Sequence, residues 1–194
     1  MKLWASLLLL LLIAACSARV PPAPRNLDDA CAIIDAQPGW LKAMQATRDR
    51  WGVPVNVQMA VIWQESKFRG DARTPFNYAL GVIPMGRDSS AYGYAQAIDS
   101  TWNWYLRETG RRGARRDDFA DATDFIGWYF DRSTQKLGIP IDSARKQYLA
   151  YHDGQTGYRR GSYRRKPWLL RIAKEVDARA DMYGEQLAAC SGTA

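Results

Sequence analysis

Met59-Ala-Val-Ile-Trp-Gln-Glu-Ser-Lys-Phe68 is the stretch around which the rest of this chain is organised. Its apolar residues recur near the helical period, which indicates a mostly buried helix with one carboxylate, Glu65, near its end. Burial disfavours the charged form of a carboxylate and raises its pKa, as a general acid working near neutral pH requires. Glutamate is also common on solvated helix faces, so this segment alone favours a surface role over a catalytic one.

Length and composition limit the number of domains and the class of protein. The 194 residues suffice for one domain with a real core, and 47% hydrophobic and 24% charged residues are typical of a globular chain rather than a disordered one. A net charge of +7 fits nucleic acid, anionic lipid or an acidic polymer as a partner and does not choose between them.

The N-terminus has the features of an export signal. Lys2 supplies a positive charge, and the apolar run that follows is too short to span a bilayer as an ordinary helix. The run ends in Ile13-Ala-Ala-Cys16, which resembles the lipobox of bacterial lipoproteins, where the cysteine is lipidated and becomes the new N-terminus. Ser17 in place of an aspartate favours, by the same resemblance, the outer membrane. The alternative is an ordinary signal peptide with an incidental cysteine.

These features divide the chain into three parts. We expect a lipoprotein signal peptide over residues 1–15, lipidated Cys16 with a Pro-rich extended tether over 16–27, and one folded domain over 28–194. Cys31 and Cys190 remain as an even pair at the two ends of that domain, and an oxidising compartment favours a disulfide between them. Two buried thiols are the alternative.

The folded part reads as a mostly α-helical domain. Hydrophobic periodicity and breakers predict helices over about 28–34, 40–51, 56–68, 101–108, 118–137, 142–151 and 167–189. Asn56 and Ser100 are expected N-caps, and residues 152–158 are expected to form a Gly-rich turn. Residues 70–90 are rich in Pro and Gly, and residues 78–83 are the only apolar run there that suits a strand, so we expect one small β-hairpin.

Three short segments carry the chemistry: Gln64-Glu-Ser66, Ala91-Tyr-Gly-Tyr-Ala-Gln96 and Leu149-Ala-Tyr-His-Asp-Gly154. In order and spacing they resemble the signature motifs of lytic transglycosylases of the soluble-lytic-transglycosylase (SLT) type, which share the goose-type lysozyme fold. The resemblance covers residues 57–187. It implies a lysozyme-like α-helical domain with a small β-hairpin excursion, and the tail ending at Cys190 suggests a lipoprotein branch of that family.

The resemblance also assigns roles. Glu65 matches the catalytic acid/base, Gln96 the cleft glutamine, and Tyr151 the tyrosine whose hydroxyl points at the carboxylate. The family's Gly-Leu-Met-Gln and Ala-Tyr-Asn are here Gly-Tyr-Ala-Gln and Ala-Tyr-His. The family serine between the first two motifs has no clear match, and Ser89 or Ser90 is the nearest candidate. The expected substrate-binding residues are therefore Gln96, Tyr151, Tyr94, Gly93, Ser90 and His152, with no metal and no cofactor.

The implied activity is that of a murein lytic transglycosylase. Such an enzyme cleaves the β-1,4 bond between MurNAc and GlcNAc and leaves 1,6-anhydroMurNAc ends, so a lone carboxylate serves as acid and then as base. The alternatives are a non-catalytic peptidoglycan-binding lipoprotein and a hydrolytic muramidase. The expected partner is the peptidoglycan glycan strand, bound by a monomeric outer-membrane lipoprotein that faces the periplasm, and export argues against nucleic acid.

Other polar and aromatic residues have simpler interpretations. His152 is the only histidine and has no companion ligand pattern, so it does not indicate a metal site. Turn and capping roles are favoured over a second catalytic carboxylate for Asp71, Asp99 and Asp153. Core packing is favoured over sugar stacking for most of the eight tryptophans, which include Trp102, Trp104 and Trp128.

Overall fold

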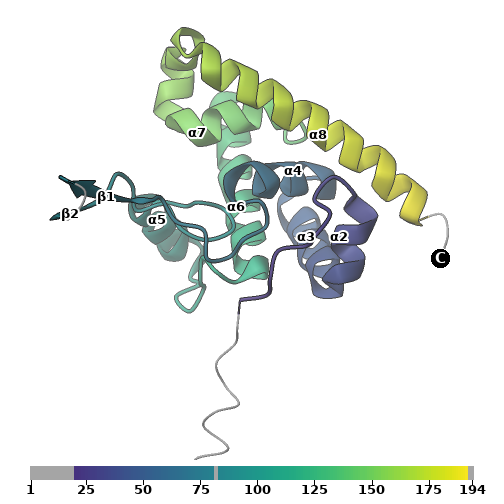
Figure 1. The fold of residues 1–194 in the computed structure, drawn as a ribbon. Coiled ribbons are helices and arrows are strands. Elements are labelled where there is room, and N and C mark those ends of the chain that lie inside the picture. Colours follow the sequence, from purple (N-terminus) through teal and green to yellow (C-terminus); the bar gives the residue numbers. More distant parts are fainter. Residues whose placement is uncertain (1–19, 81–82, 192–194) are drawn as a thin grey trace, which may run out of the picture.

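The computed structural model describes residues 20–80 and 83–191, so the predicted signal peptide and Cys16 lie outside the described residues. The elements in chain order are α2 (Ala30–Ala36), α3 (Pro38–Trp51), α4 (Val55–Ser66), β1 (Phe76–Ala79), β2 (Ile83–Arg87), α5 (Asp99–Thr109), α6 (Phe119–Leu137), α7 (Ala144–Arg160), the 3-10 turn η1 (Ser162–Arg165) and α8 (Pro167–Ser191). β1 and β2 form one antiparallel pair (Figure 1). This mostly helical architecture with a small hairpin confirms the predicted fold class.

Helix α4 is the centre of the domain. It packs against α3, α6, α7 and α8, and its residues from Val57 to Ile62 are all buried. The predicted N-cap at Asn56 is wrong, because the helix is preceded by Pro54 and the Asn56 side chain instead donates a hydrogen bond of 2.9 Å to the carbonyl of Ala180 on α8. The helix ends at Lys67, which has a left-handed backbone conformation.

Helix α6 forms the other half of the core. Asp118 caps it by accepting a hydrogen bond of 3.0 Å from the backbone of Asp121, and Gly138 ends it. Trp102 of α5 and Trp128 of α6 are buried in this core, in agreement with the favoured core role. The predicted N-cap at Ser100 is wrong, since α5 begins at Asp99, two residues before the predicted start, and its N-cap is Ile98.

Helix α7 is interrupted where a turn is expected. The Gly-rich turn predicted over residues 152–158 is confirmed at Gly154, where φ of 74° and ψ of 153° are not helical, but it is shorter than expected because a second helical segment follows directly and ends at Arg160. A glycine adopts this conformation without steric cost, so a single residue redirects the chain and the helix resumes. The kink lies directly after the third sequence motif.

The β-hairpin projects from one side of the helical body near α5 (Figure 1). Its strands cover residues 76–79 and 83–87, so the single strand expected over residues 78–83 is wrong: that segment contains the turn. Leu80 has a positive φ of 52° at this turn. The bend therefore falls inside an apolar run that local sequence pattern alone reads as one strand.

Residues 20–29, called here the N-terminal strap, lie against the domain. Val20 packs so closely on Gly70 that a Cβ added to this glycine would come within 2.5 Å of the valine side chain, and Pro24 is buried. The carbonyl of Leu27 accepts hydrogen bonds from Arg179, at 3.2 Å, and from the Tyr183 hydroxyl. The strap has no helix or strand, as expected of a Pro-rich segment, but it is docked on the domain rather than free of it.

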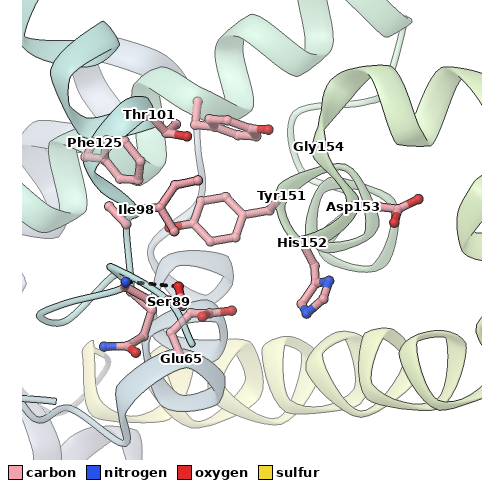
Figure 2. Close-up of a pocket in the computed structure, with 13 residues that line it drawn as sticks. Glu65, Ser89, Ile98, Thr101, Phe125, Tyr151, His152, Asp153 and Gly154 are labelled. Atoms are coloured by element: carbon pink, nitrogen blue, oxygen red, sulfur yellow. Dashed lines mark hydrogen bonds between the residues drawn. The ribbon is translucent and has the colours of Figure 1, made fainter. Parts of the chain in front are cut away.

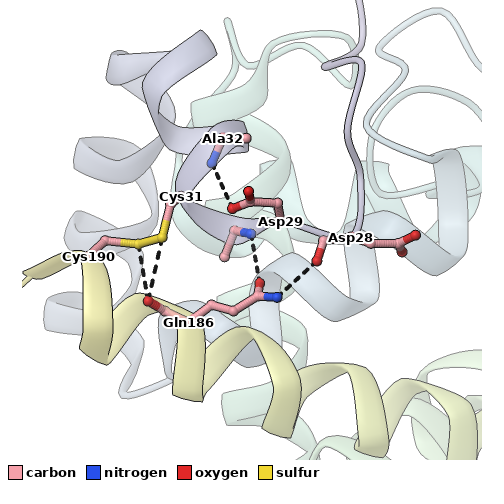
Figure 3. The surroundings of a disulfide bond; sticks show 7 residues. Asp28, Asp29, Cys31, Ala32, Gln186 and Cys190 are labelled. Carbon is pink, nitrogen blue, oxygen red and sulfur yellow. Dashed lines mark hydrogen bonds between the residues drawn. A yellow bond between two sulfur atoms is a disulfide. The ribbon is translucent and has the colours of Figure 1, made fainter.

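Cys31 and Cys190 form a disulfide that ties α2 to the end of α8 (Figure 3). Beside it, the Gln186 side chain accepts a hydrogen bond of 2.8 Å from the backbone of Ala30 and donates one of 2.9 Å to the carbonyl of Asp28. The last helix therefore holds both the strap and the first helix of the domain. No helix in the described part of the chain has the length and apolar character needed to cross a bilayer.

Candidate active site

A cleft of about 550 Å³ opens beside the end of α4. Its walls come from α4, the loop between β2 and α5, the start of α5, α6 and the middle of α7 (Figure 2). The lining residues are Glu65, Ser89, Ala91, Gln96, Ala97, Ile98, Thr101, Phe125, Tyr129, Tyr151, His152, Asp153 and Gly154. Residues of all three sequence motifs thus meet at one site.

Glu65 lies in the last turn of α4 and lines this cleft, partly exposed (Figure 2). Desolvation among the surrounding side chains raises its pKa from 4.5 to about 7, against the opposing effects of a hydrogen bond from Tyr148 and the charge of Lys67. A carboxyl with this pKa is protonated in an appreciable fraction of molecules at neutral pH and is still able to ionise. That is the property a group needs in order to give a proton and take one back.

Tyr148 is the site residue that sequence reasoning missed. It lies on α7, its side chain is 2% exposed, and it hydrogen-bonds to Glu65 and Gln64. Burial and the adjacent carboxylate raise the pKa of this tyrosine, which therefore remains a hydroxyl donor. Helical spacing could have identified Tyr148 as a site residue. It precedes Tyr151 by three residues, and residues at that spacing share a helix face.

Tyr151 lines the cleft, but its hydroxyl has another partner than the expected one. It donates a hydrogen bond of 2.5 Å to the carbonyl of Ala95, and Figure 2 shows its ring extending from α7 toward Ile98. The hydrogen-bond partner of this hydroxyl is thus a backbone carbonyl and not the carboxylate, although burial and the nearby charge of Glu65 both raise the pKa of Tyr151. Tyr151 joins α7 to the loop of the second motif, and Tyr148 contacts Glu65.

Gly93 and Gln96 shape that loop. Gly93 has φ of 80°, and a Cβ there would lie 2.0 Å from the carbonyl oxygen of Arg116, so only glycine fits this close approach. The Gln96 side-chain amide donates hydrogen bonds of 2.9 Å to Ala72 and 2.8 Å to Gly93 at their carbonyls. These bonds fix the Gln96 side chain at the cleft wall. Gly93 supports the loop and does not line the cleft.

Two further residues that were expected to bind substrate do not line the cleft. Tyr94 is fully buried and packs edge-on against Trp40 and Phe119, so the expectation that it contacts substrate is wrong. Ser90 is exposed, and its hydroxyl accepts a hydrogen bond of 3.0 Å from Asp99. Its neighbour Ser89, the other candidate, does line the cleft.

His152 and Asp153 follow Tyr151 on α7 and also line the cleft. Burial and the charge of Lys166 lower the pKa of His152, so its imidazole is neutral at pH 7. Asp153 has a side chain that is 2% exposed and is paired with Lys166 and Ser162. Burial alone would raise the pKa of Asp153, but these two hydrogen bonds outweigh it and lower the pKa.

The other carboxylates considered lie outside the cleft lining. Asp71 pairs with Arg69 at 3.3 Å and Asp99 with Arg116 at 2.8 Å, and both carboxylates are well exposed. Among the described residues, no group of three or more His, Cys, Asp or Glu side chains is placed to hold a metal ion. The cleft therefore presents one carboxyl group poised near neutral pH and a second one fixed as an ion pair.

A family model described as "Transglycosylase SLT domain" matches residues 4–190. The chain belongs to this family. It is accordingly a peptidoglycan lytic transglycosylase, a lyase of the bacterial cell wall, and the resemblance inferred from the three motifs is confirmed. A search among curated proteins found no match. Glu65, at the end of α4, is the cleft carboxyl group whose pKa burial raises to about 7.

Proposed function

We propose that this SLT-domain enzyme cleaves the β-1,4 bond between MurNAc and GlcNAc and closes a 1,6-anhydro ring on the muramic acid. The observation that carries the proposal is the unequal state of the two carboxyl groups in the cleft. The pKa of Glu65 is raised to about 7, whereas the pKa of Asp153 is lowered by its partners Lys166 and Ser162. One group is thus free for proton transfer and the other is not.

The reaction proceeds with Glu65 in two roles. Protonated Glu65 gives its proton to the glycosidic oxygen as the bond from that oxygen to C1 breaks, and the substrate's own N-acetyl carbonyl stabilises the positive charge at C1. The C6 hydroxyl of the same sugar then attacks C1 while the Glu65 carboxylate takes the hydroxyl proton. The bond broken is C1–O, the bond formed is C1–O6, and Glu65 ends protonated as it began.

This scheme fits the absence of a second free carboxylate among the described cleft residues. Glycosidases that use water or an enzyme nucleophile need two carboxyl groups flanking the bond. In the cleft of this chain, Asp153 is buried and turned away from Glu65 in Figure 2. An internal hydroxyl as nucleophile removes the need for a second base.

Purified murein sacculi incubated with the wild-type chain and with Glu65→Gln test the proposal. The wild type is expected to release muropeptides that carry anhydro ends, identified by mass. Glu65→Gln is expected to lose at least about a thousandfold in rate, because it removes the one carboxyl group of the described cleft lining that is free for proton transfer. Products with reducing ends would instead identify a hydrolytic muramidase. Binding to sacculi without any product from the wild type would identify a non-catalytic binder and overturn the proposal.

We also propose that Cys16 carries the lipid anchor of an outer-membrane lipoprotein that faces the periplasm and acts as a monomer. The support is the lipobox-like sequence before Cys16. Because the strap is docked from Val20 onward, four peptide links from Cys16 would span at most about 14 Å and hold the enzyme close to the bilayer. Labelled palmitate should enter the wild-type protein in cells and not Cys16→Ala; equal labelling of both would rule out this anchor.

A further inference from the structure

Trp168 is an unusual surface residue. Among the described residues, the exposed large apolar side chains are Phe76, Leu80, Met85, Ile98 and Trp168, and Trp168 is the only tryptophan of the set, at 43% exposed. Tryptophan is normally mostly buried, and leaving an indole in water forgoes a large hydrophobic gain. An indole kept at the surface therefore suggests a ligand that covers it.

The position of Trp168 connects it to the cleft. Trp168 lies in the first turn of α8, and its ring meets His152 edge to face, with the ring centroids 5.1 Å apart and the planes at 77°. His152 itself lines the cleft beside Tyr151. The two rings thus form an aromatic surface that continues the cleft from α7 onto α8.

This aromatic surface is held in place by an ion pair whose carboxylate is buried and whose lysine is partly exposed. Asp153, next to His152, is paired with Lys166, two residues before Trp168. Asp153 also accepts a hydrogen bond from Ser162 of η1. The carboxylate therefore joins the two elements that carry the rings, and a rigid platform loses little entropy when it binds a ligand.

The chemistry of the platform favours a neutral, partly apolar ligand. The ammonium group of Lys166 is engaged by Asp153, and the imidazole of His152 is uncharged at neutral pH. A pyranose ring offers an apolar C–H face to an indole, and its N-acetyl amide has both a donor and an acceptor for an imidazole.

We propose that His152 and Trp168 form a sugar-binding subsite that extends the cleft beyond the scissile bond and packs one N-acetylated pyranose of the glycan strand against the indole. The proposal rests on the proposed function in that the ligand is the same glycan. The subsite implies that the enzyme binds a longer stretch of glycan than the two sugars that flank the scissile bond. It also gives Asp153 a positioning role and makes the histidine of the third motif part of the binding surface.

Calorimetric titration of the full-length Glu65→Gln variant with β-1,4-linked GlcNAc oligomers, from dimer to hexamer, tests the subsite without requiring turnover. Affinity for the hexamer is expected to fall about tenfold when Trp168→Ala is added, in line with the loss of an aromatic stacking contact, while affinity for the dimer stays within about twofold. Trp168→Phe should recover most of the loss, and His152→Ala should show part of it.

Leu80→Ala, which removes an exposed apolar side chain that does not line the cleft, is the matched control and should leave hexamer affinity unchanged. Equal hexamer affinity with and without Trp168, an equal loss in Leu80→Ala, or displacement of the hexamer by free stem peptide alone would each overturn the subsite. Anhydro products from wild type on sacculi, together with any of those results, would leave the proposed function standing. If Trp168→Ala lowers hexamer affinity as expected but the wild type yields no anhydro products, the subsite stands and the proposed function fails.

Discussion

Glu65 is balanced between opposing influences. Desolvation raises its pKa, and the hydrogen bond from Tyr148 together with the charge of Lys67 lowers it. Lys67 lies over the Trp63 ring, with its ammonium 3.0 Å from the ring centroid, and this contact holds the charge near the carboxyl. The acidity of Glu65 is thus set by burial and by neighbours at the end of α4 and on α7, rather than by a second carboxylate.

Tyr148→Phe tests this balance. Removing a donor to the carboxylate should raise the pKa of Glu65 further, by about half a unit to one unit for a bond worth about 1 kcal/mol. Because the first step needs protonated Glu65, the alkaline limb of kcat/KM on murein should move to higher pH. The maximum rate should also fall, by about tenfold, because the carboxyl loses its orientation.

Tyr151→Phe is the matched control for that experiment. The Tyr151 hydroxyl is bonded to the carbonyl of Ala95, so its removal is expected to lower the rate by loosening the loop and to leave the alkaline limb where it is. The role assigned to Tyr148 would be contradicted if the alkaline limb of kcat/KM stays in place in Tyr148→Phe, or if it moves equally in both variants.

The contrast between these two tyrosines shows how far sequence reasoning reaches at a site. The motifs identify Glu65, Gln96 and the relevant helix, because residue types at fixed spacing are visible in one dimension. They do not reveal which of two hydroxyls on one helix face reaches the carboxylate, since that depends on the rotation of α7 against α4. The same limit applies to Tyr94, whose burial follows from packing against Trp40 and Phe119.

At the scale of elements, local signals predict helix cores and miss events set by tertiary contacts. Hydrophobic periodicity predicts a helix over residues 118–137, close to the observed α6, because an apolar helix face is a local property. Asn56 has the composition of a cap, but α8 passes close enough to take its amide hydrogen bond. Gly154 does interrupt the helix, as local sequence indicates, but a second helical segment that packs against α8 begins directly after it.

The connection between α2 and α8 is the element-scale feature with the clearest energetic consequence. The disulfide joins residues 159 positions apart, and closing so long a loop restricts the unfolded chain. The double variant Cys31→Ser, Cys190→Ser is expected to lose about 3–5 kcal/mol of unfolding free energy in the chain-entropy model. Urea denaturation of both proteins, at equal pH, measures this loss as a lower midpoint.

The cleft should be little affected in the same variant, because no lining residue lies on α2 or in the last turns of α8. Rates on sacculi at 25 °C are therefore expected to stay within about twofold of wild type as long as the variant is folded. An unchanged denaturation midpoint would show that Gln186 and the strap contacts hold the two ends without the covalent bond.

For the whole molecule, the site is an assembly of distant segments on a single core. Glu65 comes from the central helix, Gln96 and Ser89 from the loop after the hairpin, and Tyr148 and Tyr151 from α7, so every wall of the cleft depends on packing around α4. Such a site places a carboxyl group where the fold would be more stable without its charge. Function and stability therefore oppose each other at Glu65.

This opposition predicts a pH-dependent stability difference between wild type and Glu65→Gln. Below pH 4.5 Glu65 is protonated in both the folded and the unfolded state, and between pH 4.5 and about 7 only the unfolded state ionises. Wild-type stability should therefore decline through this interval, by at most about 3 kcal/mol, and level off above it. Glu65→Gln keeps the shape and a polar group for Tyr148 but has no charge, so it should lack this part of the decline.

Urea denaturation of both proteins at pH 4, 6 and 8 measures the difference: the variant is expected to be the more stable protein at pH 8, by about 2–3 kcal/mol, and nearly equal at pH 4. A constant difference across the three pH values would show that Glu65 ionises in the folded protein at an ordinary pKa, and the acid/base role derived from its burial would fail with it.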